Sequence, residues 1–141
     1  MCIRDRPEDV HAPIWCSISP DNCLKPIEGT VVYILEVPED KVMYFDDVKW
    51  DYVLNRIYLP DDEEDEKAYK QHLKDIGVSN GFEFFQGRYK GMYPEEEARI
   101  RESWKRAFRI DKWTIFNVCG NIWEIRQEWV KRIVKPGEAV K

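Results

Sequence analysis

The sequence contains few of the residues and motifs that usually mark catalytic or ligand-binding chemistry. It has only two histidines, His11 and His72, and neither has a cysteine or carboxylate at the spacing of a metal site. It also lacks a GxSxG nucleophile motif, a GxGxxG motif and a Walker A loop. We therefore expect no metal, and no motif indicates a serine hydrolase or a conventional phosphate-binding loop.

Long apolar segments are missing as well. The longest apolar run, residues 31–35, is far shorter than the roughly 20 residues that a membrane-spanning helix needs. The four cysteines form no CxxC pair and are too sparse for a disulfide scaffold, which favours reduced and mostly buried thiols. We expect a cytoplasmic protein without a membrane partner.

The charge is negative overall but unevenly distributed. A net charge of −5 disfavours wholesale binding to nucleic acid, because the phosphate backbone attracts positive charge. Four basic residues nevertheless recur at i, i+4, i+8 and i+11: Arg101, Lys105, Arg109 and Lys112. Pairing with nearby glutamates on a solvated helix face explains this basic stripe, and contact with RNA or DNA is the alternative.

The composition is that of a folded chain. Hydrophobic residues make up 43% and aromatic residues 13% of the 141 residues, which excludes a disordered protein. Residues 1–6 resemble translated adaptor sequence at the edge of metagenomic gene models, so we treat them as a non-native leader. Residues 7–141 have the common size of one domain.

Five short strands are predicted. Residues 13–18, 30–37 and 42–45 are rich in strand-forming residues, and the second run, apolar on both faces, predicts a central strand. Residues 113–118 and 122–125 predict two late strands joined by a turn at Gly120-Asn121, and residues 128–134 predict a further helical turn.

Three helices are predicted between these strands. Asp46 or Asp47 can cap a helix from Val48, whose apolar stripe contains Trp50, Val53, Leu54 and Ile57. The acidic run 61–66 predicts a short peripheral second helix. Pro94 with three following glutamates starts the third, which has Ile100, Trp104, Ala107 and Phe108 on one side. Residues 79–93 predict an ordered loop or an irregular hairpin.

The order of these elements favours a segregated α+β fold. We expect a small mixed sheet of about five short strands packed with about three helices. Helix capping explains the paired carboxylates Asp46 and Asp47 and the cluster 95–97, with acid–base catalysis as the alternative. Glu124 differs, because in a strand it would lie on the face opposite Trp123, toward a second layer or a cleft. A solvated glutamate is the alternative there.

Three segments together resemble a known family. They are residues 45–60 (FDDVKWDYVLNRIYLP), residues 102–108 (ESWKRAF) and residues 122–125 (IWEI), which precede Glu128. Their order and spacing resemble the bacterial and phage family catalogued as a domain of unknown function, DUF3841, over most of residues 12–134. That family begins with a strand of the type Leu-Trp-Thr-Ile-Gln and a helix. Because no counterpart precedes Pro13, the resemblance implies the C-terminal part of a longer protein.

The resemblance also implies a function. The element order of the family is similar to that of small ADP-ribosyltransferase folds, in which a glutamate on the closing strand hydrogen-bonds the nicotinamide ribose and stabilises positive charge at the anomeric carbon. Glu124 is the catalytic candidate by this analogy, and NAD the implied cofactor. The family tends to carry Gln at the position of Cys119, which leaves that position without an assigned role.

The alternative function is a non-enzymatic binding module. The glycine-rich aromatic loop 82–93, together with Arg101, Lys105 and Arg109, would then hold a protein or a nucleic acid. A nucleic-acid complex of this kind would weaken with added salt.

The tryptophans provide a test of the predicted core. Trp50, Trp104 and Trp123, with Leu54 and Phe108, are predicted to pack in one core with their indole nitrogens hydrogen-bonded. Replacing a buried tryptophan by alanine costs about 3–5 kcal/mol of the roughly 5–15 kcal/mol that stabilises a domain. Each alanine variant should therefore be insoluble or molten without any ligand. An unchanged urea midpoint for Trp104→Ala would instead favour a binding role for that helix.

Overall fold

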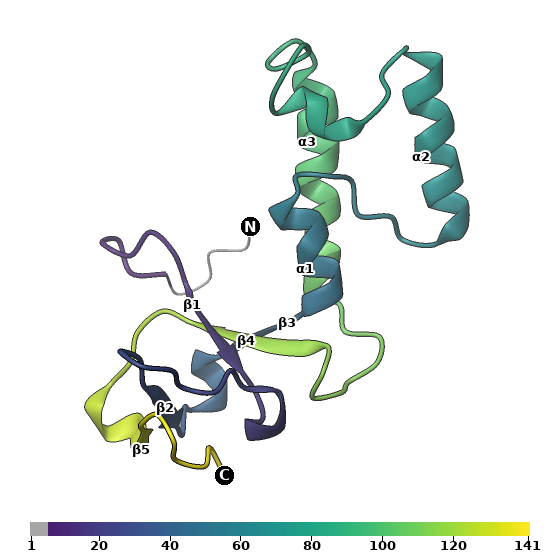
Figure 1. Cartoon of the computed structure of the whole chain (residues 1–141). Coiled ribbons are helices and arrows are strands. Elements are labelled where there is room, and N and C mark those ends of the chain that lie inside the picture. Colours follow the sequence, from purple (N-terminus) through teal and green to yellow (C-terminus); the bar gives the residue numbers. More distant parts are fainter. Residues whose placement is uncertain (1–5) are drawn as a thin grey trace. The chain divides into compact units, whose positions relative to one another are not determined.

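The computed structural model describes residues 6–141, which form two compact units where the sequence predicted one domain (Figure 1). Residues 46–110 are the helical unit, and residues 6–45 with 111–141 are the strand unit. The predicted α+β class is confirmed by three helices and five strands within the described residues. The strands form two small sheets and not one. The first five residues of the predicted leader lie outside the described residues.

Local capping signals determine where the helices begin. Helix α1, Asp47–Leu54, follows Asp46, whose carboxylate accepts a hydrogen bond from the backbone N–H of Lys49 at 3.1 Å. Helix α2, Glu63–Asp75, follows Asp62, which accepts from the backbone N–H of Asp65 at 2.8 Å. Helix α3, Pro94–Ser103, has proline in its first turn, where no backbone N–H is needed.

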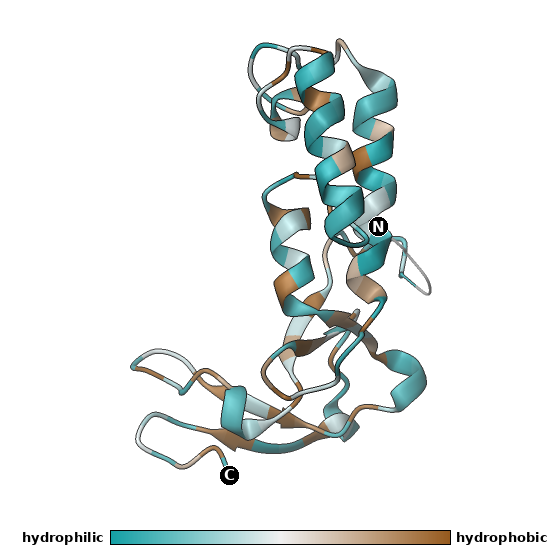
Figure 2. Ribbon diagram, turned by 90° about the vertical axis from the view of Figure 1, so that its right-hand side faces the viewer, coloured by the Kyte–Doolittle hydropathy of each residue, from teal (hydrophilic) through white to brown (hydrophobic). Residues whose placement is uncertain are grey.

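The core of the helical unit collects residues from α2, α3 and the connections between the helices. Its buried members are Tyr58, Tyr69, Leu73, Val78, Phe84, Phe85 and Ile100. The prediction that α2 is peripheral is therefore wrong, because this largely hydrophilic helix buries Tyr69 and Leu73 (Figure 2). Residues 79–93 form an ordered loop with one 3-10 turn, Gly81–Phe84.

The residues predicted to form the core differ in how deeply they are buried. Trp50 is buried and its ring contacts that of Phe108 edge-on, with 5.9 Å between centroids. Trp104 is half-buried, stacks on Phe85 and donates its indole N–H to the carbonyl of Ile57 at 2.8 Å. Leu54 is 58% exposed, so its placement in the core was wrong. Helix α1 ends at this residue, and the stripe expected to continue through Ile57 is interrupted.

Two further differences follow from local geometry. The helical stripe was expected to run through Trp104 and Phe108, but α3 ends at Ser103 and a 3-10 helix, Trp104–Phe108, follows. A 3-10 helix has about 3.0 residues per turn, so it points side chains away from the α-helical stripe. Phe108 is half-buried as a result. Trp123 belongs to the strand unit, so the three tryptophans do not share one core.

Asp65 ties the segment before α2 to the 3-10 helix that follows α3. Its carboxylate accepts hydrogen bonds from the hydroxyl of Tyr58 at 2.9 Å and from the backbone N–H of Asp61 at 2.8 Å. Arg106 lies 3.9 Å away and donates to the carbonyl of Leu59. The Asp61 hydrogen bond is the largest cause that lowers the pKa of Asp65, and Tyr58 and Arg106 lower it further against the opposing effect of burial.

The strand unit contains two sheets. Strands β1, Ile14–Ser17, β4, Val118–Ile122, and β3, Met43–Asp46, form one sheet in the order β1-β4-β3. Strands β2, Val32–Leu35, and β5, Val130–Val134, form an antiparallel pair. The most buried side chains of this unit are Phe45, Val118, Cys119, Ile122, Trp129 and Val134.

The prediction of a central strand at residues 30–37 was wrong. Strand β2 pairs with β5 alone. The paired residues Tyr33 on β2 and Ile133 on β5 are each about half exposed. A strand that is apolar on both faces has the same sequence pattern whether its outer face is exposed, as in this two-stranded ribbon, or covered by other elements. The helical turn predicted at residues 128–134 is limited to a 3-10 turn, Gln127–Trp129, before β5 begins.

The two late strands were predicted in the wrong places. Residues 115–117 form a turn, and the carbonyl of Thr114 accepts a hydrogen bond from the backbone N–H of Val118 at 3.1 Å. The backbone N–H of Thr114 donates to the side chain of Asn117 at 3.0 Å. Such side-chain-to-backbone bonds compete with strand pairing, so the alternating apolar residues there did not form a strand.

Gly120 lies in the middle of the central strand β4 and does not form the predicted turn. A Cβ atom on Gly120 would lie only 2.9 Å from Cγ1 of Val42. Strand β4 is buried along its whole length, so the neighbouring chain has little freedom to withdraw. Glycine is required here by close packing and not by an unusual backbone angle.

Gly120→Ala should destabilise the protein by about 1–3 kcal/mol, because the new methyl group overlaps Val42. Urea denaturation of Gly120→Ala, Val42→Ala and the double variant measures the overlap directly. The double variant should lose less stability than the sum of the two single losses. Strictly additive losses would contradict the proposed overlap.

Asp65→Asn should destabilise the protein by about 1–3 kcal/mol near pH 7, because a charged acceptor of two hydrogen bonds is lost. The pKa of Asp65 is lowered from 3.8 on folding, so its stabilisation is present above that value and disappears as the pH falls through the lower folded pKa. Urea unfolding at several pH values should therefore show wild type and variant converging in acid. Asp75→Asn, at an exposed position of the same helix, is the control for the removal of a carboxylate. A pH-independent difference for Asp65→Asn would contradict the assignment.

Candidate functional site

Glu124 lies two residues beyond the end of β4 and not within a strand. Its side chain is 46% exposed. Nε of Arg126 donates to the carboxylate oxygen Oε1 at 2.8 Å, and Nη2 of the same guanidinium lies 2.7 Å from that oxygen. No residue between 6 and 141 forms a hydrogen bond with the other oxygen, Oε2. One oxygen of Glu124 is thus held by the protein while the other is available.

Arg126 connects Glu124 to the core of the strand unit. Its guanidinium lies 5.4 Å from the ring centroid of Trp129, which is 6% exposed. The carbonyl of Trp129 accepts a hydrogen bond from the backbone N–H of Glu36 at 2.8 Å, just beyond β2. The hydrogen bond that Arg126 donates to Glu124 is the largest cause that raises the pKa of Arg126, so the guanidinium stays charged. The buried tryptophan and the charged arginine together orient the carboxylate.

Glu124 lines a small hollow whose volume is about 60 Å³. The lining residues come from β3, β4 and the connections of the strand unit: Pro7, Asp40, Lys41, Val42, Met43, Asn121, Trp123, Glu124 and Trp129. This volume is room for a few water-sized groups, whereas clefts that enclose a whole small ligand measure roughly 300–1,000 Å³. The hollow can therefore receive part of a sugar ring but not a dinucleotide.

Asn121 is a second polar group of this hollow. It is 8% exposed, and its side chain forms no hydrogen bond with any part of the chain that the structure describes. The sequence pattern had assigned Asn121 to a turn. Its place at the end of a buried strand, opposite Trp15 on β1, became visible only once the strand register was known. Asn121 and Glu124 can together hydrogen-bond a small hydroxylated group.

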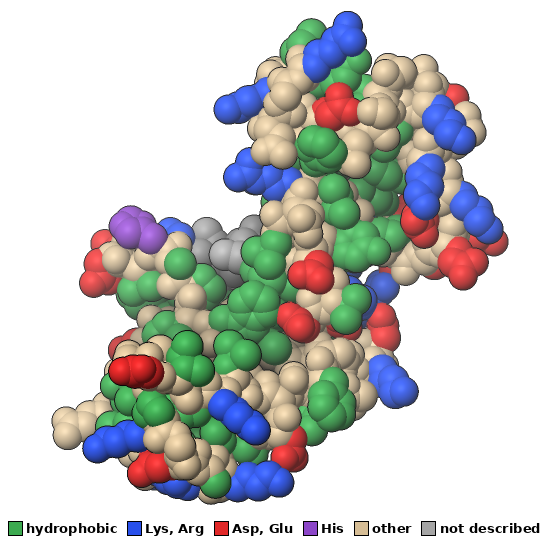
Figure 3. Space-filling model, viewed as in Figure 1, with side chains coloured by type: hydrophobic (Ala, Val, Ile, Leu, Met, Phe, Trp, Pro, Cys, Tyr) green, Lys and Arg blue, Asp and Glu red, His purple; other side chains and the backbone are tan. Residues whose placement is uncertain are grey.

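The predicted basic stripe does not form. Arg101 lies over the rings of Phe85 and Trp104, while Lys105 pairs with Glu102 at 2.7 Å. Arg109 pairs with Asp61 at 2.6 Å. Because α3 ends at Ser103, the i, i+4, i+8 spacing no longer aligns these side chains, and the basic side chains of the helical unit stand apart in Figure 3. Lys112 belongs to the strand unit.

The aromatic residues of the loop 82–93 contribute mainly to packing. Phe84 and Phe85 are 0% and 7% exposed, and Tyr89 and Tyr93 pack against the same core. Met92 is the exposed apolar residue of this loop. These four rings are therefore not an open platform for stacking bases.

Neither a metal site nor a membrane-spanning helix has support in the residues that the structure describes. No group of three or more His, Cys, Asp or Glu side chains within residues 6–141 could hold a metal ion. His72 bonds Glu96 through Nε2 at 2.7 Å, a pairing between α2 and α3 that the sequence spacing did not indicate. None of the helices in the described residues is both long enough and apolar enough to cross a membrane.

The fold and the hollow define a small α+β protein with an arginine-held glutamate beside a polar recess. The chain belongs to the family described as Domain of unknown function (DUF3841), whose model matches residues 2–131. The family resemblance noted in the sequence is thereby confirmed. No curated protein and no solved structure matches the chain.

Proposed function

We propose that the strand unit serves an NAD-linked, ADP-ribosyltransferase-like reaction in which Glu124 contacts the nicotinamide ribose. The observation that carries this proposal is the unequal use of the two carboxylate oxygens. Arg126 holds Oε1, and Oε2 is available on a residue that lines the hollow. A carboxylate held in this way is oriented before a ligand binds, which reduces the cost of positioning it.

Cleavage of the bond between nicotinamide and ribose requires an ionised carboxylate with an available oxygen. When the bond between the nicotinamide nitrogen and the anomeric carbon breaks, its electron pair leaves with nicotinamide, and positive charge develops on the ribose. The ionised carboxylate of Glu124 would accept a hydrogen bond from a ribose hydroxyl and stabilise that charge. An acceptor nucleophile then bonds to the anomeric carbon and releases its proton. Asn121 would hydrogen-bond the sugar and fix its orientation.

The size of the hollow limits what it can recognise. At about 60 Å³ it has room for part of the ribose, so the proposal assigns Glu124 and Asn121 to ribose recognition alone. The adenosine portion of NAD would bind outside this hollow. We therefore expect weak binding of NAD by the chain and a dependence of turnover on the Glu124 carboxylate.

The geometry favours this function over a binding module built from the loop 82–93 and the basic residues. Arg101 and Arg109 are engaged within the helical unit, by aromatic rings and by Asp61 respectively. Phe84 and Phe85 of the loop are buried. Glu124, in contrast, is exposed and has an available oxygen.

Glu124→Gln should reduce the release of nicotinamide from NAD by about 10²–10³-fold, because the charge that stabilises the transition state is removed. Release can be measured by chromatography of the reaction mixture. Glu128→Gln is the matched control, since Glu128 is an exposed glutamate four residues away that does not line the hollow. Its rate should equal that of wild type, and both variants should keep the wild-type melting temperature.

Two results would refute the transferase proposal. The first is a wild-type protein that neither releases nicotinamide nor shows a shift in melting temperature with NAD. The second is equal activity of wild type and Glu124→Gln. If, in addition, a fluorescent single-stranded RNA bound with an affinity that falls with salt, the binding module would be the better explanation.

A further inference from the structure

The helical unit contains a larger groove that is separate from the Glu124 hollow. Its volume is about 210 Å³. The residues that line it lie on α1, on α2 and on the connections that follow each helix: Tyr52, Ile57, Tyr58, Pro60, Glu66, Tyr69, Lys70, Leu73, Ser79, Asn80 and Gly81. Three tyrosine rings dominate this lining, which is typical of sites that bind flat organic molecules.

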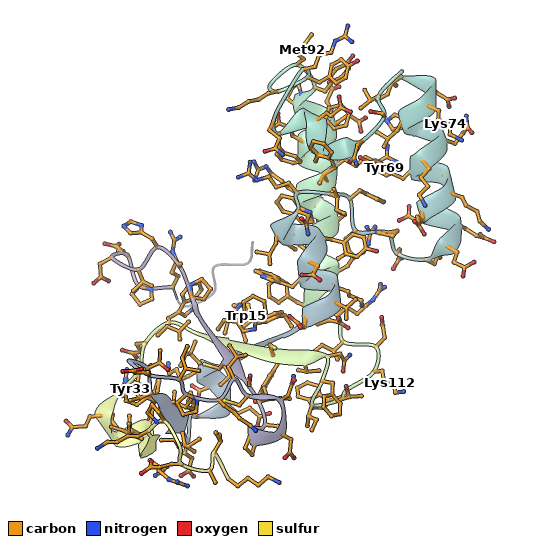
Figure 4. The ribbon with its side chains drawn as sticks, viewed as in Figure 1. Trp15, Tyr33, Tyr69, Lys74, Met92 and Lys112 are labelled. Carbon is orange, nitrogen blue, oxygen red and sulfur yellow. The ribbon has the colours of Figure 1, made fainter. Side chains whose placement is uncertain are left out.

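Tyr69 is the most informative residue of the groove. It is 6% exposed and extends from α2 toward α3 (Figure 4). Its hydroxyl oxygen is closed off from bulk solvent and has no hydrogen-bond partner in residues 6–141. Buried hydroxyl groups in folded proteins nearly always have a partner, because losing hydration without replacement costs free energy. Burial is the largest cause that raises the pKa of Tyr69, with Glu96 as the next cause, so the hydroxyl is protonated and can donate.

Gly81 keeps this hydroxyl beside the groove. A Cβ atom on Gly81 would lie 2.6 Å from the hydroxyl oxygen of Tyr69 and 3.3 Å from Cδ1 of Ile100. Any larger residue would fill the space between the hydroxyl and the groove wall that Gly81 forms. The absent side chain at Gly81 therefore leaves space beside the Tyr69 hydroxyl.

Several of the other polar side chains of the groove are engaged within the protein. Glu66 pairs with Lys70 at 2.5 Å, so the two charges at the rim offset each other. Ser79 donates to Glu83, and the side chain of Asn80 accepts from the backbone N–H of Phe82. A ligand held by a full charge is therefore not favoured here, and the buried donor without a partner is the Tyr69 hydroxyl.

The arrangement of the rings favours an electron-rich ligand. Tyr58 and Tyr69 stack with centroids 4.0 Å apart, and the guanidinium of Arg99 lies over both rings at 6.0 and 5.6 Å. The faces of the Tyr58 and Tyr69 rings are thus largely covered by each other and by Arg99, and the edges of the rings remain available to contact a ligand. Aromatic edges carry partial positive charge, so they attract acceptor atoms and the faces of other rings.

We propose that this groove binds a small planar heteroaromatic molecule, of purine size or smaller, whose ring nitrogen or carbonyl oxygen accepts a hydrogen bond from the Tyr69 hydroxyl. The ring of the ligand packs against Tyr52 and the edges of the stacked tyrosines. This site lies wholly in the helical unit and does not depend on the proposed role of Glu124.

A pair of probes of equal shape tests the hydrogen bond. Quinoline carries one acceptor nitrogen, and naphthalene has the same fused rings without it; adenine serves as a third probe. Titrations followed by amide NMR shifts should show quinoline and adenine binding more tightly than naphthalene, with shifts at residues 79–81 and along α2. Tyr69→Phe keeps the ring and should weaken quinoline about tenfold while leaving naphthalene unchanged, since one hydrogen bond is lost.

Two variants separate binding from folding. Tyr69→Phe should keep or raise the melting temperature of the free protein, because an unpaired buried hydroxyl is removed. Tyr89→Phe makes the same chemical change at a partly buried tyrosine that does not line the groove, and it should leave all three affinities unchanged. Gly81→Ala should weaken quinoline even where the variant remains folded.

Three results would overturn this inference. One is equal affinity of wild type and Tyr69→Phe for quinoline. Another is the absence of binding by all three probes, or shifts confined to the strand unit. The third is a melting temperature of Tyr69→Phe several degrees below wild type, which would mean that the hydroxyl already has a partner in the free protein.

Discussion

The close approach of Val42 to Gly120 is the constraint on which the strand unit depends. It allows β4 to lie in the middle of its sheet, buried along its whole length, with β1 and β3 as neighbours. Asn121 lies near the end of this strand, and Trp123 and Glu124 are the two residues that follow the strand. All three line the hollow. The position of the hollow therefore follows from the packing of one glycine in a central strand. The orientation of Glu124 follows from a second contact, that of Arg126 with the buried Trp129.

The helical unit is organised by a polar contact within a small apolar core. Asp65 accepts hydrogen bonds from Tyr58 and from the backbone of Asp61, and these bonds hold the segment before α2 against the helix. Tyr58 can then stack on Tyr69, which lines the groove. The acidic run 61–66 thus has a structural role, since one of its carboxylates positions an aromatic ring and another caps α2.

The two candidate sites differ in chemistry. The hollow of the strand unit offers a carboxylate and a carboxamide with little enclosed volume, which suits part of a sugar. The groove of the helical unit offers aromatic rings and one buried donor, which suits a flat uncharged molecule. Each site uses a polar atom that the protein itself leaves unpaired, Oε2 of Glu124 and the hydroxyl of Tyr69. Neither Glu124 nor Tyr69 lies in a recognised catalytic or binding motif, so known motifs do not mark either site.

Local signals in the sequence determined the helix starts and the α+β class, because the N-caps Asp46 and Asp62 and the first-turn residue Pro94 act within one helical turn. Glu124 was singled out by the family resemblance and by an expected strand at residues 122–125, whereas β4 ends at Ile122. Only the tertiary structure decided the strand boundaries near Gly120, the exposure of Leu54 and the engagement of Arg101 and Arg109. These features depend on partners that are distant in the sequence, such as Val42 for Gly120 and Asp61 for Arg109. Asn121 and Tyr69 became candidate binding residues for the same reason, since an unpaired polar atom is recognised only when its surroundings are known.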